Sequence, residues 1–462
     1  MIEFFTLHFF TILTFFLIFI TIGHLFTQRK KPSSTIAWTV TIIALPYLGI
    51  LFYIIFHGRK MDKIIKNIKE IKLENINEVH EGFDFDVEKL LRENGIAGAS
   101  SSNDFVLCLD GVDGYKKLLK LLKSADKSIY ISTYIFGKDD VTKTILDILV
   151  KKAKEGLEVK LLIDAIGSQS LEFNQSILKP LKMAGGEYHF FMSMLKHPME
   201  SRLNLRNHRK MIVVDYCHVM SGGINISDIY LSPKKTETLW MDLSFLIHGA
   251  AALHYKEIFR YNWESDTKTA LKEFKGDGSK LVYGKSIVQV VPSGPDVDSD
   301  ALYEALLASL YEAKEKIWIV TPYFAPDSSL MDALIVAKHR GIEIKIITTK
   351  ISDNFLADIS RSGFLRVLDK EEVEILFYKE NMMHAKAIMI DEKCAILGSL
   401  NFDARSFFYN FEVVSFIYTK EDIMIVQMWI EKLFPSCERG MKKAGKMRIV
   451  VENFFKMFAP AL

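Results

Sequence analysis

One short pattern occurs twice in this chain with the same internal spacing, and it limits the possible folds more than any other feature. Residues 208–225 and 384–401 both read H-x-K-x4-D-x6-G-[GS]-x-N. In each copy the histidine and the lysine are two residues apart, so they project from the same face of an extended segment. An apolar run of strand length follows each pair. The repetition predicts two copies of one domain, each presenting an imidazole and an ammonium group at the end of a core strand.

The paired residues suit phosphoryl transfer. A neutral imidazole can attack phosphorus and form a phosphohistidine, while a second, protonated imidazole donates to the leaving alkoxide. His208 and His384 are the candidates for these roles, and Lys210 and Lys386 can stabilise charge on the non-bridging oxygens. Because the lysines supply positive charge, neither a metal nor a cofactor is expected. Neither half alone holds two histidines in this pattern, so the sequence predicts one site between the halves.

Two further positions of each copy are candidate site residues. Asp215 and Asp391 belong to the catalytic motif, but they follow the apolar runs where a turn is expected, so we interpret their own contribution as structural. Asn225 and Asn401 follow glycines that allow close approach of the backbone. Their amide groups are predicted to donate to a phosphate oxygen.

The paired motif resembles that of the phospholipase D superfamily, and the flanking segments resemble those of its bacterial cardiolipin synthases. These segments are residues 134–136, 164–168, 206–210, 222–228, 293–296, 321–324, 360–362, 401–407 and 410–412. The resemblance implies two phospholipase D-like domains in a pseudo-twofold arrangement. It also implies transfer of a phosphatidyl group between two phosphatidylglycerol molecules, which gives cardiolipin and glycerol.

The resemblance further implies individual roles. It assigns the nucleophile to His208 and the acid and base to His384, although the two near-identical motifs do not themselves order these roles. Glu412 corresponds to an acid that orients a catalytic imidazole in this family, and Asp242 is its expected first-half equivalent. Arg361 and Arg405 are candidate phosphate or headgroup contacts.

The N-terminal region predicts membrane integration. Residues 4–28 and 32–58 contain no Asp, Glu, Lys or Arg, and each stretch exceeds the roughly 20 residues that cross a bilayer. With a short loop between them, residues 1–60 are expected to form a two-helix transmembrane hairpin. The basic residues that follow favour a cytoplasmic catalytic part. The expected location is therefore the bacterial cytoplasmic, or inner, membrane, with a multi-pass anchor.

The rest of the chain is expected to be α/β. A charged connector over residues 61–102 precedes the first domain, residues 103–275, and the second domain, residues 276–462. Strand-like segments 127–134 and 156–162 flank a helix-like stretch, and segments 316–323 and 341–347 repeat this order. This order predicts a mixed sheet covered by helices in both halves.

Composition is informative mainly about alternative functions. The net charge of +2 gives no global field for nucleic acid. The four cysteines lack C-x-x-C spacing and are interpreted as reduced structural thiols. Phosphatidylglycerol and membrane lipids are the expected partners. The alternatives that remain are a phospholipase D or transphosphatidylase acting on other headgroups, and a catalytically silent membrane scaffold. The oligomeric state stays open.

Overall fold

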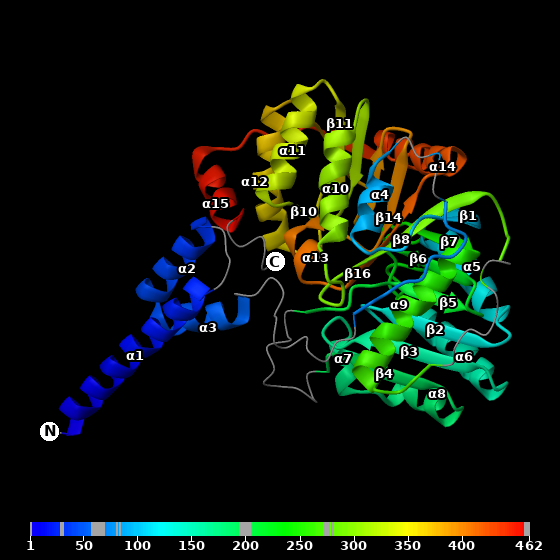
Figure 1. Ribbon diagram of the computed structural model, residues 1–462, viewed down its shortest axis with the longest axis horizontal. Coiled ribbons are helices and arrows are strands. Elements are labelled where there is room, and N and C mark those ends of the chain that lie inside the picture. Colours follow the sequence, from blue (N-terminus) through cyan, green and yellow to red (C-terminus); the bar gives the residue numbers. More distant parts are fainter. Residues whose placement is uncertain are drawn as a thin grey trace. The chain divides into compact units, whose positions relative to one another are not determined.

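The computed structural model describes residues 2–27, 32–56, 70–79, 82, 85–193, 205–271, 278 and 281–456. The expected hairpin loop at 28–31, the basic start of the connector at 61–69 and the domain boundary at 275–276 lie outside these residues. The chain divides into a helical unit at the N-terminus and a larger α/β unit (Figure 1).

The N-terminal unit departs from the expected two-helix hairpin. Its helices are α1 (Ile2–Thr27), α2 (Pro32–Ala44) and α3 (Pro46–Phe56). Among the described residues, His8–Thr27 within α1 is the stretch long and apolar enough to cross a membrane. The second apolar stretch is broken between Leu45 and Pro46, since proline lacks an N–H and disfavours helical geometry in the preceding residue. One continuous second helix was therefore a wrong prediction.

Helices α2 and α3 fold back on each other. The ring centroids of Trp38 and Tyr53 are 5.5 Å apart. Gly49 lies so close to α2 that a Cβ there would be 2.6 Å from the carbonyl oxygen of Thr41. These contacts pair late residues of α3 with early residues of α2, so the two helices run antiparallel.

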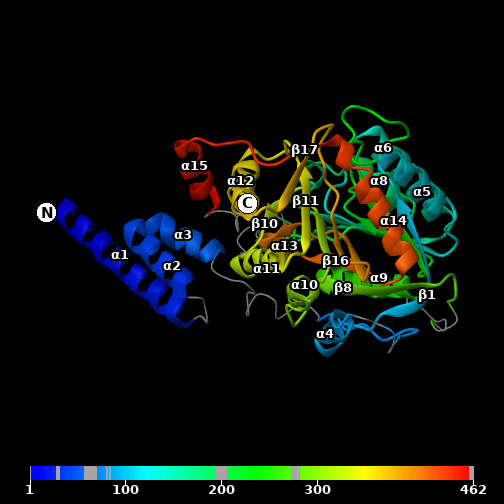
Figure 2. The ribbon, with the colours of Figure 1, turned by 90° about the horizontal axis from the view of Figure 1, so that it is seen from above.

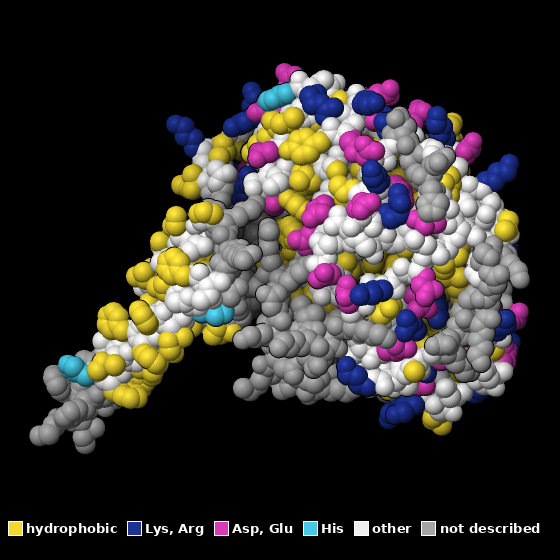
Figure 3. Space-filling view, in the orientation of Figure 1, with side chains coloured by type: hydrophobic (Ala, Val, Ile, Leu, Met, Phe, Trp, Pro, Cys, Tyr) yellow, Lys and Arg dark blue, Asp and Glu magenta, His cyan; other side chains and the backbone are white. Residues whose placement is uncertain are grey.

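Helix α3 runs in the same direction as α1. The Tyr47 hydroxyl is 2.7 Å from Thr14 Oγ1, and the Tyr53 hydroxyl is 2.8 Å from His24 Nδ1. Later residues of α3 thus meet later residues of α1. In Figure 3 the described side chains of these helices are mainly apolar, with histidines but no charged side chains on the visible face.

Within the described residues of the larger unit, fifteen strands form one mixed sheet, and two short strands, β10 (Phe324–Ala325) and β15 (Phe402–Asp403), pair separately. The first-half strands are β1 (Ser100–Cys108), β2 (Ser128–Thr133), β3 (Glu158–Asp164), β4 (Glu187–Phe191), β5 (Met211–Val214), β6 (His218–Gly222) and β7 (Ser244–His248). The second-half strands are β8 (Ser286–Ser293), β9 (Lys316–Val320), β11 (Glu343–Thr349), β12 (Glu374–Tyr378), β13 (Ala387–Ile390), β14 (Cys394–Gly398), β16 (Glu412–Ile417) and β17 (Cys437–Arg439).

The two halves of the sheet have the same strand order. Outward from the centre, the first half runs β1-β7-β6-β5-β2-β3-β4, and the second runs β8-β16-β14-β13-β9-β11-β12 before β17. The halves join where β1 pairs antiparallel with β8. The duplicated sequence motif is thus matched by a duplicated topology.

Helices cover both faces of the sheet (Figures 1 and 2). They are α4 (Val87–Glu93), α5 (Gly111–Lys123), α6 (Asp140–Lys154), α7 (Gln169–Phe173), α8 (Lys179–Met183), α9 (Ala250–Thr267), α10 (Ala301–Glu312), α11 (Ser328–His339), α12 (Phe355–Lys370), α13 (Ala404–Phe408), α14 (Lys420–Glu431) and α15 (Lys446–Lys456). Along β5, Met211 and Val213 pack in the core beneath α9 and α14, while Ile212 and Val214 pack beneath α5 and α6. This alternation follows from the two-residue period of a strand.

The predicted strands at 127–134, 156–162, 316–323 and 341–347 correspond to β2, β3, β9 and β11. The connector differs from its prediction. Phe85, Val87 and Leu91 pack in the core of the second half, and Ser100 already begins β1, the central strand of the first half. Buried apolar side chains therefore make this segment part of the α/β unit rather than a spacer.

Candidate active site

The two motif copies meet through paired backbone hydrogen bonds. The amide of His208 donates to the carbonyl of Phe411 at 2.9 Å, and the amide of His384 donates to the carbonyl of Met241 at 2.7 Å. In both cases the acceptor immediately precedes an acidic residue of the opposite half. The backbone therefore places Glu412 beside His208, and Asp242 beside His384.

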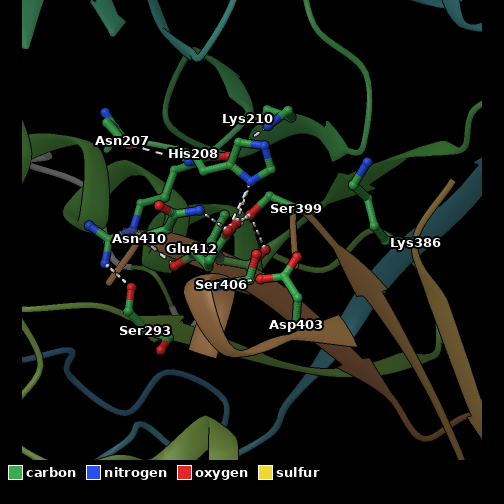
Figure 4. A network of polar contacts seen from close by, with 12 residues as sticks. Asn207, His208, Lys210, Ser293, Lys386, Ser399, Asp403, Ser406, Asn410 and Glu412 are labelled. Atoms are coloured by element: carbon green, nitrogen blue, oxygen red, sulfur yellow. Dashed lines mark hydrogen bonds and ion pairs between the residues drawn. The ribbon is translucent and has the colours of Figure 1, made fainter. Parts of the chain in front are cut away.

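His208 and Glu412 form a buried pair (Figure 4). His208 Nδ1 lies 2.8 Å from Glu412 Oε1 and 3.0 Å from Oε2. Ser399 Oγ also donates to Glu412, at 2.5 Å, and Asn410 Nδ2 donates at 3.3 Å. Because the carboxylate occupies Nδ1, Nε2 of His208 is the nitrogen left for other chemistry.

His384 and Asp242 form the second pair. His384 Nδ1 lies 2.6 Å from Asp242 Oδ2, and Asp242 Oδ1 accepts the Leu243 amide at 2.7 Å. Gly223 stands where the second half has Ser399. A Cβ at Gly223 would lie 2.2 Å from Asp242 Oδ1, so this position is open only to glycine without a shift of Asp242.

Each imidazole has its lysine beside it, and both lysines are buried. Lys210 Nζ donates to the His208 carbonyl at 2.9 Å. Lys386 Nζ lies 2.9 Å from both ring nitrogens of His384 and donates to the His384 carbonyl at 2.5 Å. The alternation predicted from the H-x-K spacing therefore brings imidazole and ammonium together in both halves.

Burial and the lysines hold both imidazoles neutral. Burial lowers the pKa of His208 to about 4, and Lys210 acts in the same direction against the opposing charge of Glu412. Burial and then Lys386 lower the pKa of His384 to about 3. At neutral pH each ring therefore has one unprotonated nitrogen, as nucleophilic attack requires. In His384 this nitrogen, Nε2, lies 2.9 Å from Lys386 Nζ.

The same buried environment also shifts the pKa values of the two lysines and the two carboxyl groups. Burial lowers the pKa of Lys210 to about 7 and that of Lys386 to about 8. Burial disfavours the charged form of Glu412, but His208 and Lys210 outweigh it and lower the pKa of this carboxyl. The pKa of Asp242 is lowered in the same way, with burial outweighed by His384 and Lys386. Both carboxylates are thus ionised at neutral pH.

Both histidines line a cavity of about 240 Å³. Its walls come from both halves and include Tyr134, Arg206, Asn225, Tyr230, Tyr323, Asp353, Asn354, Ala357, Arg361, Asn401, Asp403, Arg405, Ser406 and Asn410. The wall holds three arginines and two aspartates, Asp353 and Asp403, and guanidinium groups suit contact with a phosphate or phosphodiester. Arg361 is held by the carbonyl of Pro322 at 3.0 Å and by Asp358 at 2.7 Å.

The two candidate asparagines also line this cavity. Asn225 Oδ1 accepts the Ile135 amide at 3.2 Å, which leaves the Nδ2 group of Asn225 as the donor. Asn401 Oδ1 is buried and has no hydrogen-bond partner among the described residues. Buried polar atoms of this kind are usually satisfied by water or a ligand.

Comparison with known proteins places the chain in a family. A family model described as "Cardiolipin synthase, PLD-like domain" matches residues 118–263 and 306–434. A cardiolipin synthase of Clostridium perfringens is 31% identical over 462 residues, which cover 94% of this chain and 95% of the relative. The chain belongs to the cardiolipin synthase family of phospholipase D-like proteins. The sequence-based assignment to this family is thereby confirmed.

One further relative, a second family model and a solved structure were also similar to this chain. Cardiolipin synthase 1 of Bacillus anthracis is 28% identical over 467 residues, covering 95% of this chain and 91% of the relative. A model described as "Phospholipase_D-nuclease N-terminal" matches residues 12–57. Among solved structures, the phosphatidylserine synthase of Haemophilus influenzae superposes with a TM-score of 0.61 at 15% identity, over 81% of this chain and 97% of that one. The last comparison shows a shared fold.

In this member of the cardiolipin synthase family, Asp215 and Asp391 lie away from the cavity. Asp215 accepts the amides of residues 126, 127 and 128 at 2.9, 2.7 and 3.0 Å. Asp391 accepts those of residues 314, 315 and 316 at 3.0, 2.9 and 2.9 Å. Each thus ties the far end of its strand to the start of the neighbouring one. Their place in the catalytic set is not supported by the geometry, whereas their structural interpretation agrees with it.

No role was predicted for Arg209, which is buried behind the site. Arg209 Nη1 and Nη2 lie 2.6 and 2.8 Å from the two carboxylate oxygens of Asp296, and Nε donates to the carbonyl of Glu412 at 3.0 Å. It thereby links the first motif to the strand that carries the carboxylate of the second half. The sequence did contain a signal for this role, because Arg209 alternates with His208 and Lys210 and so faces the core, where a buried charge requires a partner.

In the part of the chain that the structure describes, no cluster of three or more His, Cys, Asp or Glu side chains could hold a metal ion.

Proposed function

We propose that the chain is a membrane-anchored phosphatidyltransferase that makes cardiolipin and glycerol from two phosphatidylglycerol molecules. The observation that carries the proposal is the pair of neutral, carboxylate-bound imidazoles that line one cavity. Two unlike half-sites of this kind can act on a single phosphorus atom, one histidine as the nucleophile and the other as the acid. The cardiolipin synthase relatives supply the substrate class.

In the first step, Nε2 of His208 attacks the phosphorus of one phosphatidylglycerol. A phosphorus–nitrogen bond forms, and the bond to the headgroup oxygen breaks. His384, protonated when the anionic phosphodiester enters the site, donates its proton to that oxygen, and glycerol leaves. Lys210, Lys386 and the amides of the two site asparagines stabilise the non-bridging oxygens.

In the second step, His384 removes the proton of the terminal hydroxyl of a second phosphatidylglycerol. The resulting oxygen attacks the phosphorus, the phosphorus–nitrogen bond breaks and cardiolipin leaves. The proton taken by His384 replaces the one given to glycerol, so each cycle is balanced. Glu412 and Asp242 keep their imidazoles in the tautomer with Nε2 directed at phosphorus.

Purified protein with labelled phosphatidylglycerol tests this proposal. Cardiolipin and glycerol in equal amounts are expected. Phosphatidic acid as the sole lipid product would instead indicate hydrolysis. An unchanged lipid composition in cells carrying His208→Ala would favour the scaffold interpretation.

We further propose that the N-terminal unit anchors the chain in the cytoplasmic membrane, with the α/β unit on the cytoplasmic side. The apolar length of α1 and the basic residues after the anchor support this. The fold-back of α3 favours one crossing by α1 with α2 and α3 re-entering, rather than the two crossings expected from the sequence. An epitope fused before Met1 should then be external and open to protease in intact spheroplasts. An epitope protected from the protease would instead support the two crossings expected from the sequence.

A further inference from the structure

Helix α15 has the reverse of the polarity expected for a helix on a water-facing surface. Its one fully buried side chain among the described residues is Glu452, which is 1% exposed. Glu452 is bound by Arg366 of α12 at 2.5 and 3.0 Å and by Arg448 at 2.8 Å. A buried ion pair thus holds the helix on α12, and Lys456 also packs over the Phe364 ring of that helix.

Most apolar side chains of α15 are exposed instead, and Phe455 is half-buried. Met447 is 77% exposed, and the exposed set is Met447, Ile449, Val450, Val451 and Phe454. In water an amphipathic helix directs such residues toward the core and its charges toward solvent. Burying a carboxylate while exposing large apolar groups suits a helix whose outer side does not face water.

A second apolar surface lies at the start of α12. Ile351 and Phe355 are 74% and 75% exposed, and Leu356 is also exposed. Several polar groups of the same turn are satisfied within it, whereas Asp353 is exposed and accepts a hydrogen bond from Tyr323. Asn354 Oδ1 accepts the amides of residues 356 and 357 at 3.1 Å each, and Ser352 N donates to Asp358 at 2.9 Å. A segment with its backbone groups satisfied and its apolar groups outward can enter lipid at low cost.

This apolar tip of α12 (Ile351, Phe355 and Leu356) adjoins the mouth of the catalytic cavity. Asp353, Asn354 and Ala357, which alternate with the tip residues along the chain, line the cavity. Helices α12 and α15 lie side by side in both ribbon views (Figures 1 and 2). Gly363 of α12 packs against the backbone of Glu452, so the tip and the outer face of α15 belong to one packed pair of helices.

We propose that the tip of α12 and the outer face of α15 form a bilayer-docking surface for anionic lipid. This inference rests on the proposed function, since it supplies the route by which a lipid phosphate reaches the histidines while its acyl chains stay in the membrane. Lys442 and Lys443 are exposed just before α15 and Lys446 at its start, and Arg448 is exposed on the helix while it binds Glu452. Basic residues at this position attract anionic headgroups, and the apolar side chains enter the interface beneath them.

Fluorescence quenching in proteoliposomes of phosphatidylglycerol and phosphatidylcholine tests the surface directly. The full chain carries Cys217→Ser and Cys437→Ser, because the other two cysteines are buried. An environment-sensitive dye is attached at Phe355→Cys or Met447→Cys. The matched control is Met424→Cys on α14, which is 56% exposed and lies apart from α12 and α15 in both ribbon views.

Dyes at positions 355 and 447 should be quenched by spin-labelled acyl chains and protected from aqueous iodide, with the reverse at position 424. Iodide quenching at 355 and 447 equal to that at 424 would overturn the docking surface. Protection from both quenchers would also overturn it, because a protein segment would then cover the face. This readout is independent of catalysis.

A kinetic comparison connects the surface to the reaction. Ile351→Ser with Phe355→Ser should lower turnover of bilayer phosphatidylglycerol by about ten-fold or more through lost interfacial burial. Turnover of monomeric short-chain phosphatidylglycerol should be unchanged, and Met424→Ser should change neither. An equal loss on both substrates would contradict the inference. Absence of glycerol release by the unaltered protein on the short-chain lipid would instead contradict the proposed function.

Discussion

The two halves of the catalytic unit share one topology and one motif, yet they build unlike surroundings for their histidines. The Glu412 carboxylate beside His208 accepts further hydrogen bonds from Ser399 and Asn410. The Asp242 carboxylate beside His384 accepts one from a backbone amide. The rings around them differ too. His384 contacts both Tyr230 and Trp240, with ring centroids at 5.1 and 5.5 Å, and His208 contacts Tyr134 alone of these rings, at 5.1 Å.

The difference indicates that duplication supplied two imidazoles and later substitution made them unequal. Position 223 is glycine where position 399 is serine, and Ala385 stands where the first half has Arg209. The more extensively bonded carboxylate belongs to the histidine proposed as nucleophile. This suits a group that must hold one orientation through bond formation and cleavage, whereas the other imidazole moves only a proton.

The largest expected effect is loss of turnover on replacing either histidine, and substrates with different leaving groups should distinguish the two roles. His208→Ala and His384→Ala should each lower turnover of phosphatidylglycerol by at least about 10⁴-fold, because each step needs both groups. With phosphatidyl-p-nitrophenol, whose leaving group needs no proton, His384→Ala should regain release of p-nitrophenol and His208→Ala should not. Stopped-flow absorbance measures the release. Equal rescue of both variants would remove the distinction.

Removing a carboxylate should impair the histidine that it contacts in the opposite half of the sheet. Glu412→Gln and Asp242→Asn should each lower turnover about 10²- to 10³-fold through loss of the oriented tautomer. Only Asp242→Asn should be rescued by the p-nitrophenyl substrate. Rescue of Glu412→Gln instead would show that each carboxylate serves the histidine of its own half, contrary to the observed contacts.

Anion affinity should fall as pH rises, in two steps. Lys210 and Lys386 are protonated below pKa values of about 7 and about 8 and lose their charges above them. The inhibition constant of sulfate, whose own charge is constant in this range, should therefore rise by up to about ten-fold per pH unit between about pH 7 and about pH 8, and more steeply above about pH 8, where both lysines lose their protons. Lys210→Arg should remove the lower step and keep the upper one. A constant value from about pH 6 to about pH 9 would show that neither lysine contacts the anion.

The smallest effect concerns the serine that distinguishes the halves. Ser399→Ala removes a hydrogen bond to the buried Glu412 and should lower turnover about five-fold, as for loss of roughly 1 kcal/mol. Turnover of the p-nitrophenyl substrate should be lowered as well, because Ser399 acts through Glu412 on His208, which attacks that substrate too. Ser399→Thr retains the hydroxyl and serves as the control. A loss confined to phosphatidylglycerol would assign Ser399 to the His384 side.

Much of the fold was predictable because it is local. The apolar runs after each H-x-K, the repeated strand–helix–strand order and the turn at each motif aspartate all follow from residues close together in the chain. The cavity residues Asn225, Asn401, Arg361 and Arg405 were also identified in the sequence. The exchange of carboxylates between halves was not, since spacing along the chain suggests that Glu412 serves His384, whereas the sheet brings it to His208.

Other features escaped prediction for related reasons. Pro46 was visible in the sequence, but uniform apolarity concealed its break between two helices. The buried pair of Arg209 and Asp296 joins residues far apart in the chain. The reversed polarity of α15 depends on Arg366 of another helix. Each of these depends on a contact that only the tertiary structure supplies.

Mapping the covalent intermediate tests most directly the claim that two unlike half-sites act on one phosphorus. His384→Ala is mixed with phosphatidyl-p-nitrophenol, quenched in alkali, where a phosphohistidine survives, and digested for mass spectrometry. The phosphatidyl group should be found on the peptide that contains His208, and the His208→Ala variant should carry none. Label on His384 in the unaltered protein, or burst release of p-nitrophenol without any labelled histidine, would contradict the assignment.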